Sequence, residues 1–537
     1  MNKKKLYNKD LIKYYFFLSI LVIFSFLSSL EQAKYYYDGL HWGDRIANAK
    51  DLLDGRLPYK DFFINYGLVT VIIHAIFLKL FNSIIFLYLS AQISYCIAII
   101  IISNLIKKHL NINYCYIFFL TIFFSAPFAL YPWHTYYLYL FLTISLYFYQ
   151  STKAYNLFFF GFFLQLAHLA SETFRYPLLA IVLFSILLSF FKNKKKIKYF
   201  FKQSALIFLG CSVPFLLFLF YLYKLDLTYY WLQHQNLTEI WKEFYKSSTL
   251  SLLFIFLKSF LNFSLFPYQI YNFIFSISSV IIIIFFFNRK NFFFCFISFF
   301  SLILNYLLIP LNENFRFFCG PILGIIPFFF LLKKIKSSFY KYLILYIFIF
   351  SLPLSMPFQK NQVNLLYIGE YTKDRINYES QLYPIKESLK IFKYMKFQKE
   401  TNQHLNVLVT LAENISNFCG DINYFSNLTT DGYYHAIMSD YFHSVQFTPG
   451  YSYSDMNINS LYNLIFQKLD KNFYSRINSE IEKKNIIIIS DISINNDINV
   501  LNKKVIFKDY IEYKLPISYN NKLKYVFIPS QCYIKFK

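Results

Sequence analysis

The chain has 537 residues, of which 57% are hydrophobic and only 15% are charged, whereas a soluble globular protein has about 25% charged residues. Apolar runs of nearly 20 residues recur, and Phe and Tyr far outnumber Gly and Pro, which excludes a disordered, collagen-like or disulfide-scaffold protein. The composition indicates a protein that crosses a membrane several times.

The formal net charge of +24 raises the question of nucleic-acid binding. No DNA- or RNA-reading motif accompanies the charge, and the basic residues lie mainly in short gaps between apolar runs. Such gaps are typical of cytoplasmic loops, so we expect a lipid bilayer and no nucleic acid as partner. The main basic gaps are Lys3 to Lys5, Lys107 and Lys108, Lys192 to Lys198, Arg289 and Lys290, and Lys333 to Lys336.

The first apolar run, residues 14–30, follows a lysine-rich start and has no A-x-A cleavage site, so it predicts an uncleaved signal anchor with a cytoplasmic N-terminus. Ten further runs approach spanning length, which makes eleven predicted spans. The other ten runs are 83–106, 112–130, 136–149, 157–170, 177–191, 204–223, 270–287, 292–310, 318–332 and 342–357.

Two more apolar stretches are ambiguous: residues 66–81, with His74 and Lys79, and residues 250–266, with Lys258. If both spanned, the basic gaps at Lys107 and at 192–198 would lie outside, against the positive-inside rule. We therefore expect both to be helices along the outer interface, where a lysine can reach water. The alternative is thirteen spans. Either count places the chain after residue 358 outside a cell membrane, which for a bacterial protein is the inner membrane.

These considerations predict two domains. Residues 1–357 would form an α-helical polytopic membrane domain, with the first outer loop and its interfacial helices at 31–82. Residues 358–537 would form an extracytoplasmic α/β domain, with a helix at 384–397 and strands at 406–411 and 485–490. Cys419 and Cys532 lie in this second domain, where a disulfide and two free buried thiols are both open alternatives.

The sequence has no phosphate-binding loop, HExxH, paired CxxC, GxSxG or dinucleotide motif. Its polar residues gather instead in the predicted outer segments, most densely at 35–68. There Asp38 follows the first span closely, and the pattern from Asp44 predicts an amphipathic helix, capped by Gly43 or Asp44 and ended by Gly55. A carboxylate held against a membrane can have a pKa high enough for general base catalysis.

This segment, with Asp38 and then the pattern G-x-x-P-Y-x-D-F-x-x-x-Y-G, resembles the bacterial GT-C membrane glycosyltransferases, which include protein O-mannosyltransferases and lipid A aminoarabinose transferase. The matching residues are Asp38, Gly55, Pro58, Tyr59, Asp61, Phe62, Tyr66 and Gly67. The resemblance covers about 35 residues. It implies a GT-C fold and transfer of a sugar from a polyprenyl-phosphate-linked donor to an acceptor hydroxyl of a cell-envelope glycan, lipid or protein.

In that family the first-loop acidic residue is the general base, which the resemblance carries over to Asp38. A second outer turn often supplies another aspartate, but here the turn reads Tyr-Pro-Trp-His, so that role is absent or falls to His134. A divalent metal ion stays open for the same reason, and we assign no metal ligands. Tyr59 and Asp61 in the same motif become substrate-binding candidates.

A phosphate leaving group at the membrane boundary needs cationic donors, and the planar guanidinium of arginine matches phosphate oxygens. Arg175 and Arg316 lie in predicted outer turns and are candidates for this role. Glu172 shares a turn with Arg175 and either binds substrate or forms a local ion pair with it.

The sequence thus favours an inverting membrane glycosyltransferase with Asp38 as base. Two other classes stay open: a transporter or flippase for a lipid-linked glycan, and a non-catalytic membrane protein whose outer domain binds a partner. A transporter would need polar residues along a path through the bilayer, whereas here they concentrate at one face.

Overall fold

The computed structural model describes residues 3–34, 41–62, 64, 67–125, 132–150, 153, 155–192, 197–228, 230–231, 234, 268–288, 291–308, 315–354, 382–384, 392–420, 422–427, 434, 437–444, 479–490, 509–516 and 525–536. The chain divides into two compact units. Unit 1 comprises Met1–Glu31, Tyr88–Phe220 and Ser247–Thr372, and unit 2 comprises Gln32–Leu87, Tyr221–Lys246 and Lys373–Lys537.

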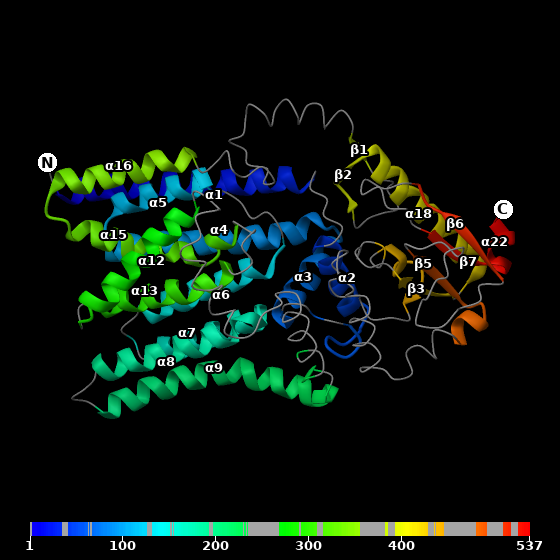
Figure 1. Cartoon of the computed structure of the whole chain (residues 1–537), viewed down its shortest axis with the longest axis horizontal. Helices are drawn as coiled ribbons and strands as arrows, with labels where there is room; N and C mark the ends of the chain where they lie inside the picture. Colours follow the sequence, from blue (N-terminus) through cyan, green and yellow to red (C-terminus); the bar gives the residue numbers. More distant parts are fainter. Residues whose placement is uncertain are drawn as a thin grey trace. The chain divides into compact units, whose positions relative to one another are not determined.

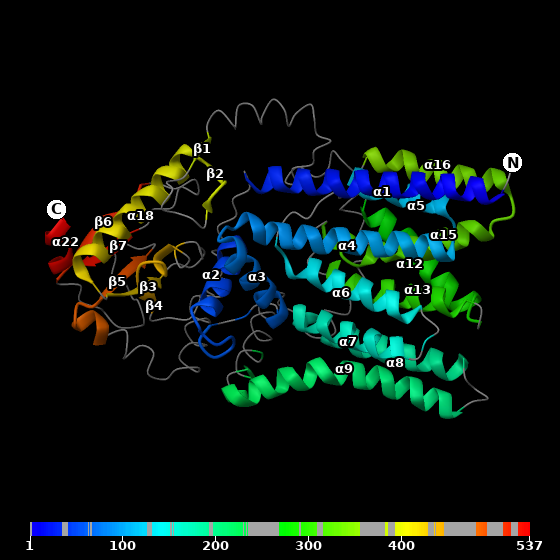
Figure 2. The ribbon, with the colours of Figure 1, turned by 180° about the vertical axis from the view of Figure 1, so that it is seen from behind.

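Unit 1 is a bundle of apolar helices that run side by side (Figures 1 and 2). Its helices are α1 (Lys3–Ala33), α4 (Ile85–His109), α5 (Ile112–Ser125), α6 (His134–Tyr149), α7 (Tyr155–Ala170), α8 (Arg175–Lys192), α9 (Ile197–Leu225), α12 (Tyr268–Phe285), α13 (Phe292–Leu304), α14 (Phe315–Phe318), α15 (Ile325–Lys334) and α16 (Ser338–Leu354). Short 3-10 turns lie at Glu172–Phe174, Asn305–Leu308 and Pro321–Gly324. Each of the eleven runs predicted to span overlaps one of these helices.

Four helical segments in the described part of the chain are long and apolar enough to cross a membrane: Lys9–Leu30, Ile85–His109, Glu172–Lys192 and Ile197–Leu225. Several others are apolar but shorter. The predicted polytopic membrane class therefore agrees with the structure, while the number of spans stays a prediction. Of the two ambiguous stretches, 250–266 lies outside the described residues, and 66–81 forms the 14-residue helix α3 (Leu68–Phe81).

Basic turns meet at one end of unit 1. The Lys333 ammonium at the end of α15 donates to the carbonyl of Leu110, 3.3 Å away, in the turn after α4. Lys107 lies in the last turn of α4, with its ammonium 4.3 Å from the ring centroid of Tyr14 in α1. The positive-inside rule requires these turns to share a side of the membrane, and these contacts agree with that requirement.

Two glycines allow a close approach of α7 and α9. A Cβ built on Gly161 would lie 2.2 Å from the carbonyl oxygen of Ile207, and one built on Gly210 would lie 2.0 Å from that of Phe158. The thiol of Cys211 also donates to the carbonyl of Gly161 at 3.3 Å. Small residues at such crossings are how membrane helices bring their backbones together.

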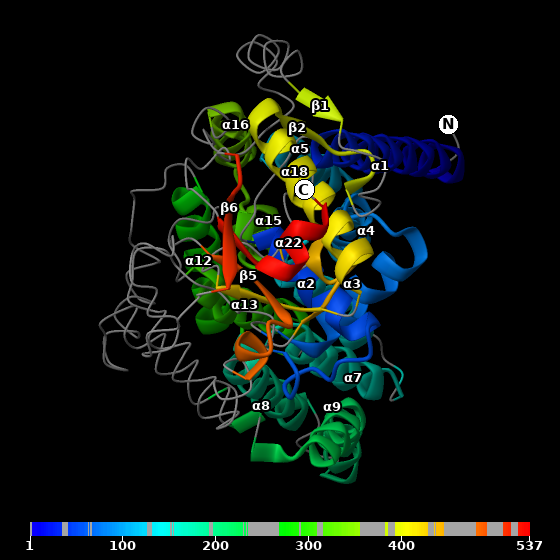
Figure 3. The ribbon, with the colours of Figure 1, turned by 90° about the vertical axis from the view of Figure 1, so that its right-hand side faces the viewer.

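Unit 2 contains a mixed five-stranded sheet in the order β4-β3-β5-β7-β6, whose strands are labelled in Figure 2. Figure 3 shows β5 and β6 of this sheet with helices α18 and α22 beside them. The strands are β3 (Asn423–Asn427), β4 (His443–Ser444), β5 (Ile486–Ser490), β6 (Tyr510–Lys514) and β7 (Tyr525–Pro529). β3 pairs in parallel with β4 and β5, and β7 pairs antiparallel with β5 and β6. A hairpin of β1 (Leu382–Pro384) and β2 (Lys396–Gln398) contacts helix α18 (Lys399–Cys419), and α22 (Ser530–Phe536) lies on β6 and β7.

The predicted α/β character of this region and the strand at 485–490 are confirmed, but two details are wrong. Residues 406–411 belong to helix α18, because Leu405, Leu408, Val409, Ala412 and Ile415 are buried at helical spacing, which a six-residue window cannot distinguish from a strand. The two ends of the predicted helix at 384–397 are also wrong, since Pro384 and Phe397 lie in the β1–β2 hairpin, while residues 385–391 lie outside the described residues.

Cys419 and Cys532 form a disulfide that joins α18 to α22. The sequence alone leaves a disulfide and two free thiols as alternatives for these cysteines. The other five cysteines are free and lie in or beside the apolar helices of unit 1. Disulfides persist in oxidising compartments, so the pairing is consistent with an extracytoplasmic location for this region.

The first loop region clusters with the C-terminal residues in unit 2. Helix α2 (His41–Leu53) packs on α3, and the ammonium of Lys50 in α2 forms an ion pair with the carboxylate of Asp440. The Ser83 hydroxyl donates to the carbonyl of Lys393 at 3.0 Å. A separate folding domain at 358–537 stays a prediction, and the described residues of that region share a compact unit with 32–87.

Helix α2 differs from its prediction in two respects. It begins at His41, so Gly43 and Asp44 lie within the helix and do not cap it. It also buries polar as well as apolar residues, since every residue from Arg45 to Asp51 is buried. Other parts of the protein therefore cover every side of α2 from Arg45 to Asp51. The spacing of apolar residues in the sequence cannot reveal such complete burial. The predicted end is confirmed, because Gly55 follows the helix with a left-handed φ of 84°.

Candidate functional site

Asp38, the predicted general base, lies outside the described residues. The remaining candidates fall into two groups, one in each unit. Tyr59 and Asp61 belong to unit 2, and His134, Glu172, Arg175 and Arg316 belong to unit 1.

The motif containing Tyr59 and Asp61 forms a tight turn after α2. The Asp61 carboxylate accepts a hydrogen bond of 2.8 Å from the backbone N–H of Leu57, and the Asp61 N–H donates to the Leu57 carbonyl at 2.8 Å. Tyr59 has a positive φ of 71° and is only 2% exposed, with its ring packed edge-on against Tyr230. The hydrogen bonds of Asp61 therefore stabilise the turn, and the buried ring of Tyr59 packs the turn against Tyr230.

The candidates in unit 1 gather where α6 and α8 begin and α13 ends. The guanidinium carbon of Arg316, in α14, lies 5.7 Å from the ring centroid of Trp133. Trp133 directly precedes His134, the first residue of α6, and both are buried. A guanidinium over an aromatic face is held by attraction to the ring, and its N–H groups at the edge stay able to donate.

The turn with Glu172 and Arg175 reaches the same place. Glu172 opens a 3-10 turn and Arg175 opens α8. Between them, the ring of Phe174 lies 6.5 Å from that of Tyr306, and Thr173 interacts with the Tyr306 hydroxyl. Arg316 lies close enough to Tyr306 for its positive charge to interact with the hydroxyl.

Polar atoms concentrate at this end of the bundle, although the surroundings are apolar. The hydroxyl oxygens of Thr135, Tyr139 and Tyr306 are buried. Thr135 lies beside Cys319, and the positive charge of Arg316 is close enough to interact with Cys319 as well. A guanidinium with several hydroxyls around it can bind and orient an oxyanion. Sequence reasoning selected Arg316 and His134 here but did not include Tyr306 or Thr135, because hydroxyl residues within apolar runs give no separate signal.

The described residues contain no group of three His, Cys, Asp or Glu side chains arranged to hold a metal ion. The candidates that could ligate one, His134 and Glu172, lie in different turns of unit 1.

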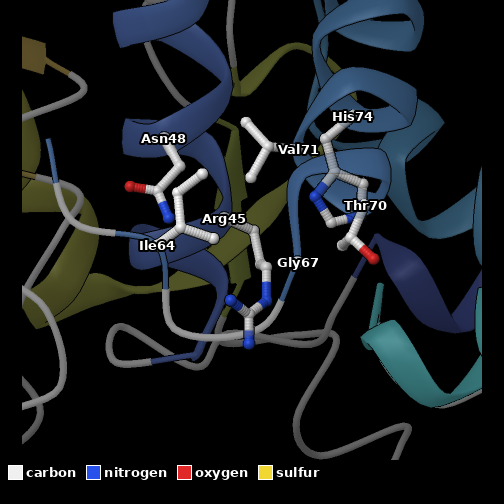
Figure 4. Close-up of a pocket in the computed structure, with 7 residues that line it drawn as sticks. All are labelled: Arg45, Asn48, Ile64, Gly67, Thr70, Val71 and His74. Atoms are coloured by element: carbon white, nitrogen blue, oxygen red, sulfur yellow. The ribbon is translucent and has the colours of Figure 1, made fainter. Parts of the chain in front are cut away.

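Unit 2 contains a small polar pocket that sequence reasoning missed. Arg45 and Asn48 of α2 line it together with Thr70 and His74 of α3 (Figure 4). These four side chains are 4%, 2%, 2% and 1% exposed. The spacing of Arg45 and Asn48 (i, i+3) and of Thr70 and His74 (i, i+4) places each pair on one helix face. That spacing was visible in the sequence, but nothing there indicated that the two faces would meet.

No family model matches the sequence, and no curated protein matches it. The fold is similar to the crystal structure of ArnT from Cupriavidus metallidurans bound to undecaprenyl phosphate, with a TM-score of 0.55 and 9% sequence identity over 96% of this chain and 98% of that one. The apo structure of the same protein matches with a TM-score of 0.50, at the same identity and coverage. The GT-C fold predicted from the first-loop motif is therefore confirmed over nearly the whole chain.

Proposed function

We propose that this protein is an inverting membrane glycosyltransferase that moves a sugar from a polyprenyl-phosphate-linked donor to an acceptor hydroxyl of a cell-envelope glycan, lipid or protein. The reaction takes place on the extracytoplasmic face of the inner membrane, with the N-terminus in the cytoplasm and the C-terminal region outside. The observation that carries the proposal is the GT-C fold, since the similarity covers 96% of this chain and 98% of a protein crystallised with undecaprenyl phosphate.

The cluster around Arg316 supports the same proposal. A polyprenyl-phosphate donor leaves its lipid phosphate behind at the membrane boundary, where negative charge grows on the leaving oxygen. Arg316 is held by Trp133 next to the turn that contains Glu172 and Arg175. A fixed guanidinium at that place would offset the growing charge without reorganising during the reaction. Arg175 would add a second cation, and His134 and Glu172 would contact the sugar or the acceptor.

Asp38 completes the proposed chemistry. The acceptor oxygen attacks the anomeric carbon from the face opposite the phosphate, and a new C–O bond forms as the bond to the phosphate oxygen breaks. The phosphate leaves with that electron pair, and the acceptor proton passes to the Asp38 carboxylate. Tyr59 and Asp61, in the turn after α2, would contribute to substrate binding.

The test is transfer of radiolabelled sugar from a purified polyprenyl-phosphate donor by the full chain in detergent. Asp38→Asn should abolish transfer and leave membrane insertion and melting behaviour unchanged, since an amide is isosteric but cannot accept the proton. Asp10→Asn, in the first helix α1, provides a matched carboxylate-to-amide control that should transfer normally. Near-normal transfer by Asp38→Asn would remove Asp38 from the mechanism.

The same assay separates the enzyme from the other two classes. A flippase would move the labelled lipid across the bilayer of a vesicle without releasing sugar to an acceptor. A non-catalytic binding protein would do neither. Absence of transfer for every donor and acceptor pair that supports a purified GT-C enzyme would contradict the proposal.

A further inference from the structure

We propose that one end of unit 1 binds an anionic phospholipid, with the headgroup at the turns that follow α4 and α15 and the acyl chains along α16. The headgroup site consists of Lys108, Lys333 and Lys341, which we call the basic cluster. Figure 1 shows the turn between α15 and α16 at the same end of the bundle as the start of α1. The proposal needs only a membrane protein and does not depend on the proposed function.

Two contacts bring lysines from separate turns together. The Lys333 ammonium donates to the Leu110 carbonyl at 3.3 Å, and the Lys341 ammonium lies 5.9 Å from the ring centroid of Tyr114. Leu110 and Tyr114 are four residues apart across the start of α5, so both ammonium groups lie beside the same short segment. Lys108 precedes Leu110 by two residues and is exposed.

The positive charge of the basic cluster is not neutralised within the part of the chain that the structure describes. None of its three lysines forms an ion pair there with an Asp or Glu side chain. Asp10 of α1 lies near α5, since the Tyr116 hydroxyl donates to the Asp10 backbone carbonyl at 3.5 Å, but the Asp10 carboxylate pairs with none of these lysines. Like charges held close together repel one another, so an anion between them is favoured.

The surface next to the cluster is apolar, which favours a lipid over a soluble anion. Lys341 lies near the start of α16, and Tyr342, Tyr346 and Phe350 follow at intervals of four residues, each more than half exposed. That spacing places the three rings on one face of the helix, where they can contact acyl chains. A headgroup at the start of an apolar helix with its chains along the helix matches the arrangement of a phospholipid in a bilayer.

The experiment is native mass spectrometry of the full chain in nonionic detergent, titrated separately with phosphatidylglycerol and with phosphatidylcholine of the same acyl chains. We expect phosphatidylglycerol to bind about tenfold or more tightly, because the choline group of the other lipid neutralises its phosphate. Glycerol 1-phosphate supplies the headgroup without acyl chains. It should bind about tenfold or more weakly than phosphatidylglycerol, since it leaves the apolar face of α16 uncovered.

Paired variants test the lysines. Lys333→Gln with Lys341→Gln should weaken phosphatidylglycerol binding about tenfold or more and leave phosphatidylcholine binding unchanged, a result that a general structural defect would not give. Lys333→Arg with Lys341→Arg keeps the charge and should bind like the wild type.

The matched control is Lys198→Gln with Lys202→Gln, which removes two exposed lysines from the first two turns of α9. It changes the net charge by the same amount and should alter phosphatidylglycerol affinity by less than about twofold.

Equal affinity for the two lipids in the wild type would overturn the proposal, as would an equal loss of binding in the α9 control, which would mean that net charge decides and not the basic cluster. Glycerol 1-phosphate binding as tightly as phosphatidylglycerol would assign the cluster to a soluble anion and would also overturn it. Thermal unfolding checks that each variant folds. If the double Gln variant does not fold, Lys341→Gln alone decides, with an expected loss of about threefold or more.

Discussion

Lys50 of α2 forms an ion pair with Asp440, 390 residues further along the chain. The pair joins the first loop region to the C-terminal region, and its two sides differ in exposure: the Lys50 side chain is 10% exposed and that of Asp440 is 49% exposed. Loss of the carboxylate leaves a poorly hydrated ammonium behind, whereas loss of the ammonium leaves a carboxylate that water can reach.

Asp440→Asn should therefore destabilise the protein more than Lys50→Met. We expect a loss of about 1 to 3 kcal/mol for Asp440→Asn, between the values typical of exposed and buried pairs. Thermal unfolding in detergent measures it. Asp509→Asn breaks the more exposed Lys484–Asp509 pair of 2.8 Å and should change stability by less than about 0.5 kcal/mol. Equal effects of the two Asp variants would mean that Lys50 is as well hydrated as Lys484.

Arg316→Met should lower kcat/KM for sugar transfer by about 10² or more, because it removes a fixed cation from the growing phosphate charge. Lys334→Met is the control, since the Lys334 ammonium also lies over an aromatic ring, 5.3 Å from the ring centroid of Phe330. Lys334 is in the last turn of α15 beside Lys333, at the end of unit 1 where the basic turns meet. It should transfer normally. If Arg316→Met keeps wild-type kinetics, the cluster around Trp133 is structural.

The Cys419–Cys532 disulfide should form in cells if the C-terminal region faces an oxidising compartment. A thiol-reactive polymer added to the unfolded protein should then label five cysteines, and all seven after reduction. The double Ser variant should lose about 2 to 5 kcal/mol of stability. Seven labelled cysteines without reduction, in protein taken directly from membranes, would contradict the proposed orientation.

Glu480 should make stability depend on pH in the acid range. Partial burial raises the pKa of this carboxyl, but hydrogen bonds from Asn485, Lys483 and Asn423, at 3.0 to 3.2 Å, outweigh it and hold the pKa below its ordinary value. A carboxyl group whose pKa is lower in the folded protein than in the unfolded chain stabilises the fold at pH values above its ordinary pKa. This stabilisation disappears as the pH falls through the lowered pKa.

Glu480→Gln should therefore unfold at a lower temperature than the wild type at neutral pH, by a small margin, and match it at strongly acid pH. Thermal unfolding at a series of pH values measures the difference. Glu482→Gln, a neighbouring carboxylate, serves as the control. A difference between wild type and Glu480→Gln that grows as the pH falls would reverse the sign of the argument.

Gly161→Ala should destabilise the helix bundle, although alanine favours helices more than glycine does. The added Cβ would lie 2.2 Å from the Ile207 carbonyl oxygen, so α7 and α9 would have to separate. We expect a cost of about 1 to 3 kcal/mol, typical of overpacking. Leu209→Ala, on an exposed part of α9 next to Gly210, is the control. A more stable Gly161→Ala would mean that the helices do not cross closely.

The sequence by itself determined the solvent and the class of fold. Hydrophobic composition and the length of apolar runs depend only on local residue order, so they predicted a polytopic membrane protein. The motif from Asp38 to Gly67 predicted the GT-C fold that the comparison with ArnT confirms. Gly55 at the end of α2 and the strand at 485–490 were predictable for the same reason, since a left-handed turn and a short β-branched run are local features.

Tertiary structure alone decided which distant residues meet. Arg316 was a candidate from its residue type, but its position over Trp133 depends on how α6, α8 and α13 pack. The glycine crossing of α7 and α9, and the pocket shared by Arg45 and His74, likewise appear only when two helix faces meet. Periodicity shows which face of a helix is apolar, but it does not show which neighbour covers that face, because the neighbour is chosen by packing over the whole chain.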